Sequence, residues 1–291
     1  MKVTILWIRH CESCANVVNH SKYKKRWFTD RKQGFEIPPN CTLIGLIQSY
    51  MFGYHVLPLL LKKYPQFKNI DLYCSVLKRT MITNKLIMHG LKKSKYKVKT
   101  SKEVERLCNI SERPTPYERM KRIEFNNISV KKSNKQLKKV NKTYKKTGKK
   151  ISKRIRKKTK QCGKTNLEKF SEEILPTFNN KSLNLIVAHG VILRRFLKIK
   201  RFNNVDAALV EHDTTTGKFK IIEEIRNKTD LSEVKNSYKR IKDGSYNLHY
   251  KSKSINHRAK ITIEEFEKVL DLKLAKQLQL KKLDNEITCD K

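Results

Sequence analysis

The segment ILWIRHCESCANVV, residues 5–18, joins an apolar run to an Arg-His pair and then to a polar stretch with helix-compatible residues. β-Branched and aromatic residues fill KVTILWI (2–8), which indicates a buried strand. Arg9 and His10 follow this strand at once. The imidazole is either a neutral ring packed at a strand end or the group that reacts, and the rest of the chain bears on that choice.

Two further segments repeat this arrangement of a strand followed by basic residues. IDLYCSV (70–76) is a strand candidate with Arg79 just beyond it. The continuous apolar run LNLIVAHG (183–190) is the clearest strand of the chain, and His189 stands at its end. A weaker strand, YKVKT (96–100), is expected between them.

Apolar residues at helical spacing occupy the segments between the strands. The helices expected from this spacing span residues 42–64, 78–91 and 191–199. Thr42 is the candidate N-cap of the first helix, and Gly90 is expected to end the second. Strands that alternate with helices predict an α/β fold, here a three-layer α/β/α sandwich with a mostly parallel central sheet.

Four basic side chains follow the strands of this sheet: Arg9, His10, Arg79 and His189. The carboxyl ends of parallel strands share one edge, where α/β proteins bind their ligands. Four such residues at one topological position predict an anion-binding pocket. A neutral imidazole there could attack phosphorus and form a phosphohistidine, while guanidinium groups hold the phosphoryl oxygens and a carboxylic acid protonates the departing alcohol.

The same residues carry a resemblance to a known family. RHCESCAN (9–16) resembles the R-H-G-E-S-x-x-N signature of the histidine phosphatase superfamily, whose fold is also called phosphoglycerate mutase-like. Three later segments resemble further motifs of that family in the family's order, namely CTLIGLIQ (41–48), CSVLKRTMIT (74–83) and IVAHGVILR (186–194). The resemblance covers most of residues 1–225.

The resemblance implies a role for each residue of the pocket. His10 is the expected phosphate-accepting nucleophile, and His189 is expected to share in catalysis. Arg9, Arg79, His189 and Asn16 are the residues expected to bind the substrate phosphate. No cofactor and no metal are expected, because the arginines supply the positive charge that phosphoryl transfer needs.

The family's general acid stands between the second and the last motif, commonly as the Glu of a P-x-I-x-E pattern. VERLCNISE offers Cys108 in place of the proline, followed by Ile110 and Glu112 at the matching spacing. Glu112 is therefore the expected acid. Glu105 and Glu103 are near enough in sequence to compete for the role.

Two departures from the family's pattern bear on activity. Cys11 stands where the family usually has glycine, directly after the nucleophile. No counterpart of the R-H-Y-G segment of the phosphoglycerate mutases follows the acid region, which favours hydrolysis over isomerisation. The function expected is thus a phosphatase that hydrolyses phosphomonoesters through a phosphohistidine, a histidine acid phosphatase-type phosphoric monoester hydrolase.

Two alternative functions stay open at this point. The chain could be a catalytically weak or inactive family member that binds polyanions through its basic insertion, or a phosphoglycerate mutase-like phosphotransferase. For the phosphatase, the expected partner is a phosphorylated small-molecule or phosphoprotein substrate, with non-specific polyanion contact as a possible addition. Sugar phosphates, inositol phosphates, nucleotides and phosphoproteins all remain candidates, and the oligomeric state is left undecided.

Positive charge is the extreme feature of the composition. The chain of 291 residues has 67 Lys and Arg against 27 Asp and Glu, a formal net charge of +40. Such a field attracts polyanions without selecting among them. Lysine outnumbers arginine by 51 to 16, and a diffuse lysine excess does not indicate a specific phosphate-binding partner. It is also typical of AT-rich coding, as in some large viruses.

Part of this charge lies in one stretch of the chain. Residues 131–160 contain sixteen Lys or Arg, no acidic residue and few apolar ones. This composition predicts a lysine-rich insertion at about 126–166 that interrupts a histidine phosphatase-like domain of residues 1–225. Residues 226–291 are expected to form a polar extension that ends in an amphipathic helix.

The seven cysteines are odd in number and scattered, which argues against a disulfide framework and for a reducing compartment. Cys11 and Cys14 form a C-E-S-C pair whose oxidation is expected to inhibit a reaction at His10, and the absence of a second such pair argues against a metal site. No apolar run is long enough for a membrane span, and the amino terminus is unlike a signal peptide. We expect a cytoplasmic protein, in the host cell if the protein is viral.

Overall fold

The computed structural model describes residues 1–13, 16, 41–101, 104–112, 166–227 and 245–270, and every structural statement below concerns these residues. The predicted insertion at about 126–166 lies outside the described residues except for Asn166. Cys14 and Glu103 lie outside them too.

The described strands form one central sheet in the order β3-β2-β5-β1-β6-β7-β8-β9, and β4 pairs with β2. Their bounds are β1 (Lys2–Arg9), β2 (Asn69–Ser75), β3 (Lys99–Thr100), β4 (Glu105–Leu107), β5 (Leu183–Ala188), β6 (Ala207–Asp213), β7 (Phe219–Asn227), β8 (Ser245–Lys251) and β9 (Asn256–Thr262). Strands β1 to β5 are mutually parallel, whereas β6 to β9 are antiparallel to their neighbours. The predicted α/β class is confirmed, and the sheet is parallel only in its first half.

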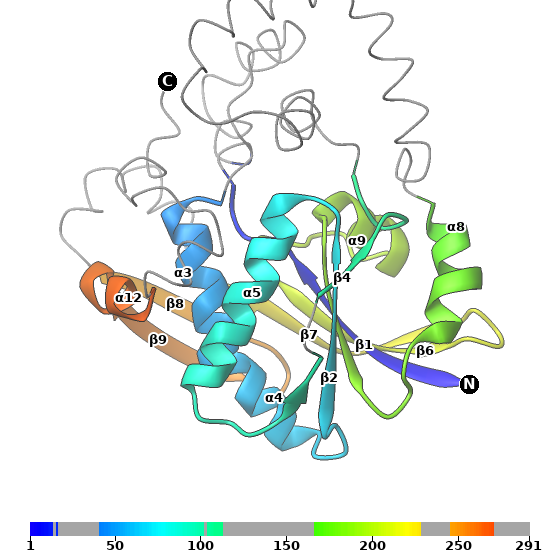
Figure 1. Cartoon of the computed structure of the whole chain (residues 1–291), viewed down its shortest axis with the longest axis horizontal. Coiled ribbons are helices and arrows are strands. Elements are labelled where there is room, and N and C mark those ends of the chain that lie inside the picture. Colours follow the sequence, from blue (N-terminus) through cyan, green and yellow to red (C-terminus); the bar gives the residue numbers. More distant parts are fainter. Residues whose placement is uncertain (14–15, 17–40, 102–103, 113–165, 228–244, 271–291) are drawn as a thin grey trace, which may run out of the picture.

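Helices cover both faces of the sheet (Figure 1). One face carries a long helix made of α3 (Leu43–Met51), the π-helical turn η1 (Phe52–Val56) and α4 (Leu57–Lys63), together with α5 (Lys78–Lys93). The other face carries α8 (Leu167–Lys169), the turns η4 (Phe170–Ile174) and η5 (Leu175–Thr177), and α9 (Gly190–Leu197). The three layers match the predicted sandwich.

Strand β1 shows why the sheet is buried on both sides. Leu6 and Ile8 pack in the core beneath α3 and α5, whereas Ile5 and Trp7 pack in the core on the side of α9. Successive side chains of a strand point to opposite faces, so a strand with two buried faces must be a continuous apolar run. This requirement accounts for the composition of KVTILWI.

The stretch Leu43–Lys63 is long and apolar enough, by length and composition alone, to cross a membrane. In the described part of the chain, 78% of its most apolar window is buried inside the protein. A core helix shows the same composition because it is surrounded by apolar neighbours. The stretch is therefore weak evidence for a membrane span.

Glycines allow α5 to lie very close to the long helix. A Cβ atom on Gly90 would collide with the carbonyl oxygen of Tyr50, and one on Gly53 would collide with that of Ile87. α5 continues through Gly90 to Lys93, so the expectation that Gly90 ends the helix is wrong. Gly90 therefore allows α5 to cross the long helix at close range, and it does not end α5.

Residues 245–269 add β8, β9 and α12 (Ile263–Val269) to the same core. Tyr250 of β8 is fully buried, and its hydroxyl donates to the carbonyl oxygen of Gln48 at 3.1 Å. Phe266 of α12 is fully buried against Tyr50, with 5.8 Å between the ring centroids. This differs from the polar extension expected for 226–291. Polar and buried residues alternate in the hairpin, so the average composition hides its apolar face.

One buried imidazole makes the fold sensitive to acid. The His212 ring lies between Phe196 and Phe219, with centroid distances of 5.4 and 5.5 Å, and its Nε2 has no hydrogen-bond partner among the described residues. Burial lowers the pKa of His212 to about 4. Between about pH 6.5 and pH 4, His212 is therefore protonated in the unfolded chain but neutral in the folded protein.

We expect His212→Phe to reduce the loss of stability in acid. The free energy of unfolding of the wild-type protein should fall as the pH drops from about 6.5 towards 4. Between pH 7 and pH 5, the wild type should lose about 2 kcal/mol more of it than the variant does. Urea unfolding at both pH values measures the difference. His249→Phe, on the half-buried β8 position, is the control. Equal pH dependence in wild type and His212→Phe contradicts this account.

Candidate active site

The candidate site lies at the carboxyl ends of β1, β5 and β2, which are neighbours in the sheet. Arg9 ends β1, and His10 follows it with its backbone N–H donating to the carbonyl oxygen of Ala188. His189 follows β5 and is the N-cap residue of α9. Arg79 lies in the first turn of α5, four residues after the end of β2. The common edge of three parallel strands thus brings together residues that are far apart in sequence.

The His10 ring is oriented for reaction at Nε2. The side chain is 3% exposed, and Nδ1 lies 2.7 Å from the carbonyl oxygen of Cys11. A carbonyl can only accept, so Nδ1 carries the proton and Nε2 holds the lone pair. The His189 ring meets that of His10 edge to face, with 5.2 Å between the centroids.

His189 is held by partners on both sides of its ring. Nε2 lies 2.7 Å from Ser75 Oγ, and Nδ1 lies 3.4 Å from a terminal nitrogen of Arg79. The guanidinium can only donate, so Nδ1 accepts from it and the proton sits on Nε2, which donates to Ser75. This leaves a neutral His189 beside His10.

Glu112 completes the group. Its Oε2 accepts from Arg79 at 3.1 Å and lies 3.6 Å from His189 Nδ1. The Glu112 side chain is 32% exposed, whereas that of Arg79 is 7% exposed. The carboxyl group therefore stands at the mouth of the pocket, where it can meet a ligand and solvent. Glu105 lies on β4 with an exposed side chain and takes part in none of these contacts.

Arg9 reaches the pocket over α9. One terminal nitrogen donates to the carbonyl oxygen of Phe202 at 2.6 Å, and Nε is buried without a hydrogen-bond partner among the described residues. A Cβ on Gly190 would lie 2.9 Å from that Nε. The absence of a Cβ on the glycine after His189 therefore leaves room for the Arg9 guanidinium, whose buried Nε–H has no partner among the described residues.

Asn16 lies on the outside of the loop that carries His10. Its Oδ1 accepts from Ser13 N at 3.2 Å and from Asn204 Nδ2 at 3.2 Å. Asn204 Nδ2 also lies 2.9 Å from the carbonyl oxygens of His10 and of Cys11. In the described structure the Asn16 oxygen thus orders the loop, while the predicted contact of Asn16 with phosphate stays a prediction.

The electrostatics of the pocket favour neutral imidazoles beside cationic guanidiniums. Burial lowers the pKa of His10 well below its ordinary value, and the charges of Arg79 and Arg9 lower it further. Burial and then Arg79 lower the pKa of His189 in the same way. Both rings are therefore uncharged at neutral pH, so His10 has a free lone pair while the arginines keep the pocket attractive to anions.

The motif residues around the site hold the His10 loop against α3. Thr42 caps α3, and its hydroxyl donates to the buried carboxyl group of Glu12 at 2.8 Å. A Cβ on Gly45 would collide with the carbonyl oxygen of Glu12. The glycine of CTLIGLIQ is therefore required for the close approach of α3 to the loop.

This close approach also brings two cysteines together. Cys11 and Cys41 form a disulfide with 5.9 Å between their Cα atoms, and Cys108 is disulfide-bonded too. The expectation that the cysteines form no disulfides is wrong at these positions. Among the described cysteines Cys74 is free and buried. The parity of the cysteine count does not say which cysteines meet in space.

The disulfide changes two earlier interpretations. Cys11 is already bonded to Cys41, 30 residues away, so it is not available to the predicted pair with Cys14. The argument from unpaired cysteines no longer supports a reducing compartment. The cytoplasmic location therefore stays a prediction without that support.

We expect the loss of this disulfide to lower the free energy of unfolding by about 2–4 kcal/mol, because the bond closes a long loop in the unfolded chain. Cys11→Ala, Cys41→Ala and the double variant should cost similar amounts, since either single substitution already removes the bond. Urea unfolding of the three variants and of Cys74→Ala measures this. If the double variant loses as much free energy of unfolding as the two single variants together, the disulfide assignment is contradicted.

No group of three or more His, Cys, Asp or Glu side chains that could hold a metal ion occurs in the described ranges of the chain. The expectation that the site uses neither metal nor cofactor stays a prediction.

Sequence reasoning missed two residues that position the histidines. Ser75 holds His189 Nε2, and its position inside CSVLKRT is a signal that could have identified it. Asn204 donates to the carbonyl oxygens of His10 and Cys11, and it lies in the loop before β6. We find no sequence pattern around Asn204 that indicates this role.

Comparisons with known proteins give structural matches only. No protein-family model matches the chain, and no curated protein matches it. Among solved structures, phosphoglycerate mutases from Plasmodium falciparum and Bacillus anthracis match at 14% and 16% identity with a TM-score of 0.32 each; they cover 76% of this chain and 89% and 91% of theirs. A phytase from Klebsiella sp. ASR1 matches at 8% identity and a TM-score of 0.40, over 81% of this chain and 84% of its own. All three are members of the histidine phosphatase superfamily.

Proposed function

We propose that the chain is a histidine phosphatase superfamily member that hydrolyses phosphomonoesters at His10. One observation carries the proposal: a neutral His10 whose Nδ1 is held by a carbonyl presents Nε2 to a pocket made by Arg79, Glu112 and His189. This arrangement combines a nucleophile, charge stabilisation and an acid within one strand edge.

In the first step, the Nε2 lone pair of His10 forms a bond to phosphorus while the bond from phosphorus to the ester oxygen breaks. Arg9 and Arg79 hold the phosphoryl oxygens, with His189 beside them, and stabilise the charge that develops there. Glu112 gives its proton to the departing alcohol. Its place at the mouth of the pocket suits this role, because the leaving group must lie on the side open to solvent.

In the second step, water attacks the phosphorus and the bond to Nε2 breaks. Glu112, now a carboxylate, takes a proton from that water, and inorganic phosphate leaves. The Cys11 carbonyl keeps the proton of His10 on Nδ1 throughout, so the ring returns to its starting tautomer. Phosphate must compete with Glu112 for Arg79. When the substrate displaces it, Glu112 takes a proton from solvent, and after product release it returns that proton to solvent and pairs with Arg79 again.

The experiment that tests the proposal is a hydrolysis assay of the purified protein on 4-nitrophenyl phosphate, followed by a panel of sugar, inositol and nucleoside monophosphates and phosphopeptides. We expect saturable release of inorganic phosphate that survives chelators. A protein that binds phosphate but releases none from any substrate is an inactive member. Activity that depends on a bisphosphate primer identifies a mutase instead.

A further inference from the structure

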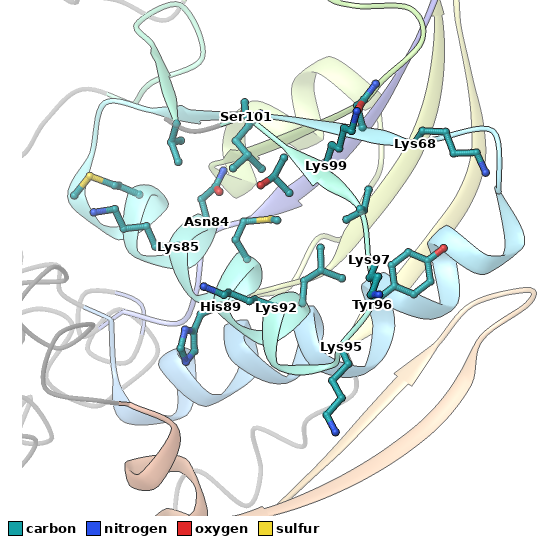
Figure 2. A pocket seen from close by; sticks show the side chains of 18 of the residues that line it. Lys68, Asn84, Lys85, His89, Lys92, Lys95, Tyr96, Lys97, Lys99 and Ser101 are labelled. Carbon is teal, nitrogen blue, oxygen red and sulfur yellow. Dashed lines mark hydrogen bonds between the residues drawn. The ribbon is translucent and has the colours of Figure 1, made fainter.

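A second concave site lies along the outer side of α5, away from His10 (Figure 2). Its volume is about 1610 Å³, which exceeds the range of about 300–1,000 Å³ usual for small-molecule pockets. The walls come from α5, the loop that follows it, and β2, β3 and β4. None of the residues that contact His10 or His189 in the candidate active site lines it. We call it the α5 cavity.

Positive charge dominates the rim of the α5 cavity. Six lysines line it, namely Lys68, Lys85, Lys92, Lys95, Lys97 and Lys99. Arg106 on β4 adds a further cation, and no Asp or Glu is among the lining residues that the structure describes. Figure 2 shows Lys85 and Lys92 on α5, and Lys97 and Lys99 on the wall across from them. Like charges held this close together favour an anionic ligand that lies between them.

The floor of the α5 cavity is apolar. Leu72 and Leu91 are buried at its base, and Met81, Met88 and Val98 are half-buried around them. Methionine side chains are flexible and are common on surfaces that bind peptides of varied sequence. An apolar floor under a cationic rim matches a ligand that has both aliphatic and anionic groups.

The side chains favour a peptide over a nucleic acid. A groove for single-stranded nucleic acid needs aromatic rings on which successive bases stack, and among the described lining residues of the α5 cavity Tyr96 is the one Phe, Tyr or Trp. The His89 ring is engaged, with Nε2 at 2.9 Å from the carbonyl oxygen of Val269. Lysines outnumber arginines six to one among the described lining residues, so the rim offers separate point charges rather than planar guanidinium forks.

We propose that the α5 cavity binds an acidic, amphipathic peptide segment of a partner protein. Its carboxylates pair with the lysines of the rim, and its aliphatic side chains pack on the methionines and leucines of the floor. From Met81 to Lys92 the helix rises about 16 Å, the length of about five residues of an extended chain. The chain's own residues 271–291 contain five lysines and four acidic residues, so they do not supply the complementary charge. This binding activity is separate from the proposed hydrolysis.

The test is a fluorescence anisotropy titration of the full chain with a short fluorescein-labelled peptide of alternating Glu and Leu. We expect Lys92→Glu/Lys97→Glu/Lys99→Glu to weaken binding by about tenfold or more, through the loss of three ion pairs at exposed positions. A peptide of alternating Glu and Ser should also bind more weakly, because it leaves the floor empty. His10→Ala should bind the Glu-Leu peptide like the wild type, which separates this test from the test of hydrolysis.

A matched variant controls for the large net charge. Lys200→Glu/Lys218→Glu/Lys253→Glu changes the net charge by the same amount at exposed positions outside the α5 cavity. An equal loss of binding in both triple variants overturns the proposal, since the peptide is then attracted by overall charge alone. Tighter binding of an oligouridylate than of the peptide, lost in the cavity variant, also overturns it and makes the ligand a nucleic acid. Failure of the wild-type protein to bind the Glu-Leu peptide overturns the proposal as well.

Discussion

Replacing His10 by alanine is expected to lower kcat/KM for phosphomonoester hydrolysis by about 10⁴-fold or more, because no other group then stands ready to take the phosphoryl group. The residual rate comes from the arginines, which still bind the substrate and stabilise charge. The measurement is release of inorganic phosphate from 4-nitrophenyl phosphate at pH 5.5 and pH 7. The activity of the wild type should persist at the lower pH, because burial and two arginines keep the pKa of His10 well below its ordinary value.

The matched control is His249→Ala, which removes an imidazole from β8 and leaves the site intact. Far-ultraviolet circular dichroism and the urea midpoint show whether His10→Ala still folds. His10→Asn keeps a polar side chain at the position in case alanine destabilises the loop. Folded His10 variants that retain more than a tenth of the wild-type rate contradict the assignment of the nucleophile.

Replacing Glu112 by glutamine is expected to lower kcat/KM by about 10²–10⁴-fold for an alkyl phosphate such as glycerol phosphate. An alkoxide is a poor leaving group, so its departure needs the proton that Glu112 supplies. The loss should be much smaller for 4-nitrophenyl phosphate, whose phenolate leaves without protonation. The dependence on leaving group separates a general acid from a residue that only orients Arg79, which would affect both substrates alike.

Glu105→Gln and Glu103→Gln are the matched controls, since both residues compete with Glu112 in the sequence. Of these three carboxyl groups, that of Glu112 is described in contact with Arg79 and close to His189. We therefore expect wild-type kinetics from the Glu105 variant. A leaving-group dependence that follows Glu105 or Glu103 instead shows that the acid has been assigned to the wrong residue.

The sequence predicts the first half of the sheet better than the second. β1 and β5 are buried on both faces, so their apolar runs are nearly continuous and easy to recognise. The hairpin of β8 and β9 buries one face only, and its alternating residues resemble a polar extension. Gly90 shows a further limit. A glycine near the end of a helical pattern indicates a C-cap, but here a close helix crossing requires it, and a sequence does not show which helices cross.

The site is predictable where strand ends decide it. Arg9, His10 and His189 directly follow parallel strands, so their meeting follows from topology, and the 5.2 Å between the two imidazoles agrees with it. The contacts that fix ring orientation are not predictable in this way. Asn204 and Cys41, the disulfide partner of Cys11, come from loops, whose course no local sequence pattern shows.

The most direct test of the central claim is to trap the phosphoenzyme and find the residue that carries the phosphate. The protein is mixed with ³²P-labelled substrate, quenched with alkali, under which phosphohistidine survives, and digested for mass spectrometry. The account predicts one labelled peptide with the phosphate on His10, and no label in His10→Ala. Phosphate on His189 or on another residue, or steady hydrolysis with no trapped intermediate at any quench time, would contradict it.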